Sequence, residues 1–129
     1  MSVNDPDARV LDAAVLDELR ASVEGDSAFV VDLVEAYLAD GARHVAEVAA
    51  AIEAVDAAAV VRPAHTLKSS SATVGAMRLA GIARELEMDG RAGTLEAASA
   101  GERAADLRTA WDEASTALRA WVLDEGQRA

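Results

Sequence analysis

The segment RPAHTLKSSS, at residues 62–71, has the residue types and spacing of a reactive site. Its histidine, His65, is one of two histidines in the chain. Read as a helix, the segment turns an apolar stripe away from His65, so we expect the imidazole to face solvent. That stripe consists of Val60, Ala64, Leu67, Ser71 and Val74. Residues three, four or seven positions away share the face of His65. They are Arg62, Lys68, Ser69 and Ala72.

A solvent-facing imidazole between two cations suits nucleophilic chemistry. The charges of Arg62 and Lys68 would disfavour the charged ring and leave a neutral nitrogen able to attack phosphorus. The same cations and the Ser69 hydroxyl could then hold the oxygens of a phosphoryl group. Residues 57–84 contain four basic residues and no acidic one, in a chain with 23 acids and 12 bases. This charge pattern favours an anionic partner, although ordinary segregation of charge between helix faces explains it equally well.

The elements that must position this segment are predicted to be α-helices. The 129 residues include 32 alanines, the strongest helix former, and only four Phe, Tyr or Trp residues. The β-branched residues are not gathered into strand-like runs. A chain of this length can bury one core and is too short for two domains. We therefore predict a single all-α domain.

Caps and glycines divide the chain into five predicted helices. Asp12, Asp26 and Asp56 are the predicted N-caps of the first three helices, and Gly75 ends the third. Pro63 lies inside the third helix and predicts a kink or a helix restart, because proline lacks a backbone N–H. The first predicted helix spans residues 13–24, and the second is the long stretch between Asp26 and Asp56. The third, fourth and fifth span residues 57–74, 76–89 and 94–124.

Apolar residues repeat in steps of three and four along the two longest predicted helices, which indicates faces packed against partner helices. In the second helix they are Val31, Val34, Leu38, Gly41, Val45, Val48, Ile52 and Val55. In the last helix they are Ala97, Ala100, Ala104, Leu107, Trp111, Ala114, Leu118 and Trp121. The fourth helix turns Leu79, Ile82 and Leu86 inward, and residues 90–93 form the next turn.

Amphipathic helices with short connections predict an antiparallel four-helix bundle with a short additional N-terminal helix. The predicted bundle covers residues 11–125. Residues 1–10 form a polar N-terminal tail, and residues 126–129 form a C-terminal tail.

The segment AHTLKSSSA at residues 64–72, followed by Val-Gly-Ala at 74–76, resembles the signature of histidine-containing phosphotransfer (HPt) domains. That signature is a histidine, Leu-Lys two and three residues later, small residues, and then Gly-Ala. The resemblance covers roughly residues 10–122. Further matching positions are Leu11-Asp12, Gly25-Asp26, Phe29 and Leu86-Glu87. The chain departs from the pattern at Ser69, where glycine is usual, and at Pro63, which is unusual two residues before the histidine.

The resemblance implies that His65 accepts a phosphoryl group from a receiver-domain aspartate and passes it to another receiver. Lys68 then matches the lysine that helps to hold the phosphoryl group, and Gly75 matches the structural glycine at the end of the histidine-bearing helix. The partners implied are response-regulator receiver domains and a hybrid histidine kinase. The protein would be a carrier without autokinase activity, since it has no nucleotide-binding loop. It would need no cofactor of its own, with Mg²⁺ supplied by the receiver.

Other kinds of site receive less support from the sequence. A di-metal bundle needs Glu-x-x-His motifs, but Gly41 and Arg62 stand three residues before the two histidines, and the chain has no cysteine. We read the second histidine, His44, as an ordinary surface residue or as one that supports a neighbouring group, because nothing around it suggests a site. A net charge of −11 and a pI near 4.4 argue against binding to nucleic acid or to membrane surfaces.

The N-terminus has no basic start and no apolar core, so we expect a cytoplasmic protein without a signal peptide. Met1 and the intact tail favour a free-standing protein, which we expect to be a monomer. Two alternatives stay open. One is a non-catalytic helical module that binds a receiver or a histidine kinase, and the other is a structural bundle that oligomerises through an apolar face.

Overall fold

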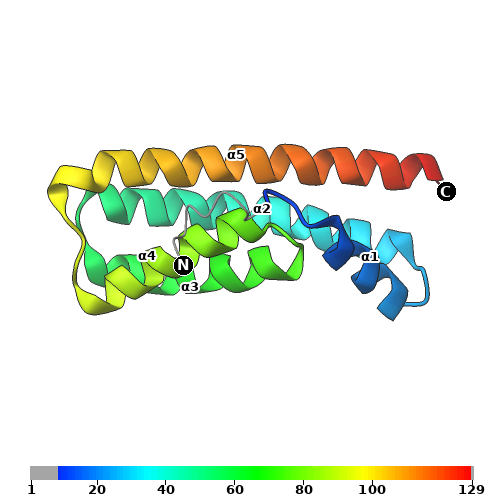
Figure 1. The fold of residues 1–129 in the computed structure, drawn as a ribbon, viewed down its shortest axis with the longest axis horizontal. Coiled ribbons are helices and arrows are strands. Elements are labelled where there is room, and N and C mark those ends of the chain that lie inside the picture. Colours follow the sequence, from blue (N-terminus) through cyan, green and yellow to red (C-terminus); the bar gives the residue numbers. More distant parts are fainter. Residues whose placement is uncertain (1–8, 129) are drawn as a thin grey trace.

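The computed structural model describes residues 9–128, which form five helices and no strand (Figure 1). The helices are α1 (Ala13–Ser22), α2 (Ser27–Glu53), α3 (Ala57–Thr73), α4 (Met77–Ala92) and α5 (Ala97–Arg128). The all-α prediction is confirmed. Within this part of the chain no helix is both long and apolar enough to cross a membrane.

The first three helices begin at the predicted caps. Asp12, Asp26 and Asp56 each accept a hydrogen bond of 3.1 Å from a backbone N–H in the first turn that follows. Each of these bonds satisfies a donor that the start of a helix would otherwise leave without a partner. The predicted caps of α1, α2 and α3 are therefore confirmed.

The four longer helices share one core. α2 packs against α3 and α5, and α4 packs against the same two helices, while α1 contacts α2. In Figure 1, α5 runs beside α2, and α1 lies at the end of the molecule where α5 terminates. Every member of the predicted apolar stripe of α3 is buried. Its one polar member, Ser71, shares a 2.7 Å hydrogen bond with the buried hydroxyl of Tyr37 on α2.

Most predicted core positions of α2 and α5 are also correct. Those that are buried are Val34, Gly41, Val45, Val48, Ile52, Ala100, Ala104, Leu107, Ala114 and Leu118. The ends of the two series are wrong. Val55 lies past the end of α2 with φ at 52° and is exposed, and Ala97, in the first turn of α5, is exposed. Four more predicted members are only partly buried: Val31, Leu38, Trp111 and Trp121.

The fourth helix is longer than predicted. Leu79, Ile82 and Leu86 are buried as expected, but α4 continues through Gly90 to Ala92. Gly90 is not a helix stop. It is buried where α4 approaches α3, and a Cβ there would lie 2.9 Å from a backbone oxygen of α3. Gly93, with φ at 69°, ends the helix in the left-handed conformation that glycine tolerates best.

Other features of the helices also differ from the sequence interpretation. α1 ends at Ser22 instead of residue 24, and α5 begins at Ala97 instead of residue 94. α3 is one continuous helix through Pro63, so there is no restart there. α5 continues to Arg128, so the predicted C-terminal tail at 126–129 falls largely inside a helix. Residues 1–8 of the predicted N-terminal tail lie outside the part of the chain that the structure describes.

Candidate functional site

His65 stands on the outward face of α3, beside α4. Its neighbours Ala64 and Leu67 are fully buried and fix which face of α3 meets the core. As a consequence the imidazole is 55% exposed. The prediction of a solvent-facing ring is confirmed.

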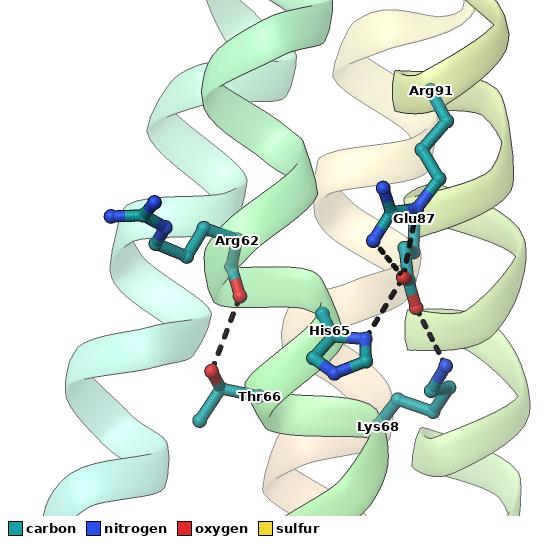
Figure 2. A network of polar contacts seen from close by, with 6 residues as sticks. All are labelled: Arg62, His65, Thr66, Lys68, Glu87 and Arg91. Carbon is teal, nitrogen blue, oxygen red and sulfur yellow. Dashed lines mark hydrogen bonds and ion pairs between the residues drawn. The ribbon is translucent and has the colours of Figure 1, made fainter.

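A nearly buried carboxylate organises the site (Figure 2). The side chain of Glu87, on α4, is 7% exposed, and its Oε2 lies 2.9 Å from Nδ1 of His65. Its Oε1 lies 2.7 Å from Nζ of Lys68, one turn after the histidine on α3. Arg91, one turn further along α4, donates to Oε2 from Nη2 at 2.8 Å and from Nε at 3.0 Å. We call these four residues the Glu87 network.

The network keeps Glu87 ionised. The hydrogen bond from Lys68 is the main cause that lowers the pKa of Glu87 to about 2; Arg91 and His65 add to the effect, and partial burial opposes it. An ionised carboxylate can only accept hydrogen bonds. Nδ1 of His65 must therefore carry a proton and donate a hydrogen bond to Glu87.

This contact has a chemical consequence at the other ring nitrogen. In a neutral imidazole with its proton on Nδ1, the lone pair is on Nε2. Figure 2 shows that second nitrogen directed away from Glu87. Glu87 thus selects the tautomer and holds the ring, much as a carboxylate orients the histidine of a catalytic triad. The arrangement leaves a nitrogen with a lone pair on the side of the ring that faces away from Glu87.

The structure brings together only part of the predicted site. Lys68 is beside the ring, but its ammonium group is paired with Glu87. Ser69 is exposed one turn after His65. Figure 2 shows the side chain of Arg62 directed away from the ring and towards α2. The expected environment of two flanking cations is therefore wrong, because an anionic carboxylate lies against the ring.

Gly75 has a structural position at the end of α3. It follows α3 with φ at 82°, and its carbonyl accepts a 2.8 Å hydrogen bond from the N–H of Asp12. A Cβ at Gly75 would lie 2.6 Å from the Asp12 carbonyl oxygen. Only glycine fits this contact between the end of α3 and the start of α1.

Sequence reasoning missed two members of the network. The sequence pattern includes Glu87 among the matching family positions without giving it a role, and it predicts a turn at Arg91. The available signal was their spacing, since a glutamate and an arginine four residues apart pair on one helix face. Among the residues described, no group of three His, Cys, Asp or Glu side chains could hold a metal ion.

Comparisons with known proteins agree with this geometry. A family model for the Hpt domain matches residues 32–121. The chain belongs to the Hpt domain family. A search of curated proteins found no match. The crystal structure of histidine-containing phosphotransfer protein B (HptB) from Pseudomonas aeruginosa PAO1 is similar, with a TM-score of 0.77 and 26% sequence identity over 91% of this chain and 97% of that chain.

Family membership confirms the resemblance seen in the sequence and gives the general role. Hpt domains are phosphocarriers that interact with receiver domains and kinases of two-component systems. This Hpt domain has a histidine phosphotransfer role in phosphorelays.

Proposed function

We propose that His65 is the phosphoryl-accepting residue of this Hpt domain and that Nε2 is the atom that carries the group. The observation that supports this most strongly is the 2.9 Å contact between Nδ1 and Glu87. Because of this contact Nδ1 carries the proton of the neutral ring, and the lone pair is on Nε2. The second histidine of the chain, His44, has a buried Nδ1 for which the described residues supply no hydrogen-bond partner.

The donor in this proposal is an aspartyl phosphate on a receiver domain. The Nε2 lone pair attacks phosphorus, the N–P bond forms, and the bond from phosphorus to the aspartate oxygen breaks to release the carboxylate. The ring gains positive character in this step, and the Glu87 carboxylate stabilises it through the Nδ1 proton. The reverse step passes the group to the aspartate of a second receiver.

Most of the rate enhancement would come from positioning and charge, because phosphoryl transfer needs little covalent chemistry from the protein. We assign Lys68 to the phosphoryl oxygens, since it lies within one turn of His65 on the same face. Ser69 would add a hydroxyl to the same group. Arg62 would contact the partner's acidic surface rather than the ring. Mg²⁺ would come with the receiver.

The four mutually packed helices are, in this proposal, an antiparallel bundle that acts as a monomer. It is a rigid support that presents one face of α3 to each receiver in turn. The protein would relay phosphate without autokinase activity.

The test is transfer from a phosphorylated receiver domain, with Mg²⁺, to the wild-type protein, to His65→Gln and to the control His44→Gln. We expect acid-labile, base-stable label on the wild type and on His44→Gln, and none on His65→Gln. If folded wild-type protein binds receivers but takes no label from any of them, the function is that of a non-catalytic binding module.

A further inference from the structure

The two cations of the Glu87 network do not occupy equivalent positions. Arg91 donates to Oε2, the oxygen that also accepts from His65, whereas Lys68 pairs with Oε1. Figure 2 shows Arg91 and Lys68 reaching Glu87 from opposite directions, with the second ring nitrogen directed away from Arg91. Lys68 is therefore the cation placed to meet a group on that nitrogen, and Arg91 is not.

A phosphoryl group on His65 changes the balance of charge at the site. It adds up to two negative charges close to a carboxylate that is already ionised. Lys68 must then leave Glu87, or share its ammonium protons, to reach the phosphoryl oxygens. A nearly buried carboxylate that loses its cation is costly, so this exchange needs a second cation that stays in place.

We propose that Arg91 is a positioning residue that keeps Glu87 paired while Lys68 moves from Glu87 to the phosphoryl group. The inference rests on the proposed function of His65. Arg91 acts through Glu87 and Lys68 and does not touch the transferred group. The two bonds from Nε and Nη2 to one oxygen hold the guanidinium to Glu87 without help from Lys68.

Arg91 is well suited to a substitution test. Its side chain is 59% exposed, so its replacement leaves no cavity in the core. Arg108, on α5, is a matched control because it is 52% exposed and donates to Glu53 at the same distance of 2.8 Å, away from His65. Comparison of Arg91→Gln with Arg108→Gln separates the loss of a cation at the site from the loss of a surface ion pair.

The probe is phosphoramidate, a small donor that needs no receiver. Its N–P bond breaks as Nε2 of His65 bonds to phosphorus, and the leaving nitrogen takes up a proton and departs as ammonia. Phosphohistidine formation would be followed by ³¹P NMR in the wild type, Arg91→Gln, Arg91→Lys, Lys68→Gln, the Lys68→Gln/Arg91→Gln double variant and Arg108→Gln.

We expect Arg91→Gln to slow phosphorylation about tenfold, near the lower end of the range for hydrogen bonds to a charged group, because the Arg91 side chain is largely exposed. Arg91→Lys should recover most of the rate, and Arg108→Gln should match the wild type. In the Lys68→Gln background the Arg91 substitution should have a smaller effect than in the wild type, because no lysine is left to exchange. The ring ¹⁵N shifts of unphosphorylated Arg91→Gln should still report a proton on Nδ1.

The results separate this inference from the function on which it rests. Absence of label on the folded wild type would overturn the proposed role of His65. A labelled wild type with Arg91→Gln at the Arg108→Gln rate would overturn only the role of Arg91. An equal slowing by Arg91→Gln with and without Lys68 would also overturn it, because Arg91 would then act independently of the exchange.

Discussion

The buried carboxylate of the site makes a prediction about stability that can be worked out from the structure. Replacing Glu87 by Gln keeps the size of the side chain and removes its charge. The folded protein lowers the pKa of Glu87 from 4.5 to about 2. A group with a depressed pKa stabilises the fold above its ordinary pKa, and this contribution is lost as the pH falls towards the folded-state value.

The magnitude follows from the size of the shift. Each pKa unit corresponds to about 1.4 kcal/mol, so the shift sets an upper bound of about 3.5 kcal/mol. The side chains of His65 and Arg91 are 55% and 59% exposed, and water screens their interaction with Glu87. We therefore expect the free energy of unfolding of the wild type to exceed that of Glu87→Gln by about 1–2 kcal/mol at pH 7. About half of that advantage should disappear between pH 5 and pH 3.

The assay is urea unfolding at pH 7, 5 and 3, followed by circular dichroism and by the fluorescence of Trp111 and Trp121. The difference between wild type and variant isolates Glu87, because the other carboxylates titrate in both proteins. Glu53→Gln is the control, since its side chain is 51% exposed and paired with Arg108. It should change stability by less than about 0.5 kcal/mol at every pH. A Glu87→Gln difference that stays constant from pH 7 to pH 3 would refute the charged network.

Three further predictions concern close helix contacts and buried polar groups of the bundle. Gly90→Ala should lower the free energy of unfolding in urea by about 1–3 kcal/mol, because the added Cβ meets α3. Gly101 lies in open space on a helix, so Gly101→Ala should raise that free energy by about 0.5–1 kcal/mol. Equal effects of the two substitutions would contradict the close approach of α4 to α3. Tyr37→Phe should cost about 1–2 kcal/mol by leaving the buried Ser71 hydroxyl without its partner, and an unchanged unfolding midpoint would show that the hydroxyl finds another. Glu125 is a buried carboxylate that accepts hydrogen bonds from side chains of α1 and α2. Glu125→Gln should therefore accelerate amide hydrogen exchange in α1 by at least about tenfold relative to α3. An equal change of exchange in both helices would show that Glu125 does not hold α1 in place.

The sequence predicted the elements around His65 well because their signals are local. Each aspartate cap lies next to the helix that it starts. The burial of Ala64 and Leu67 follows from spacing along a single helix, and it places His65 outside. Short-range rules were sufficient for the orientation of the His65 ring.

The carboxylate that holds the ring could not be found in the same way. Glu87 reaches His65 only because α3 and α4 pack together, and a one-dimensional pattern does not report that register. Because the sequence predicts the end of a helix before Gly90, it does not place Arg91 on the same helix face as Glu87. A glycine that marks a close helix contact and a glycine that ends a helix look alike in sequence, and only the distance to α3 tells them apart.

In the proposed mechanism Glu87 holds a proton on Nδ1 of His65 and leaves Nε2 to carry the phosphoryl group. The most direct test is NMR of the ¹⁵N-labelled protein after transfer from a phosphorylated receiver domain with Mg²⁺. We predict phosphorus coupled to Nε2 of His65, a proton on Nδ1, and no phosphorylated species in His65→Gln. Phosphorus on Nδ1, or on any residue other than His65, would contradict this account.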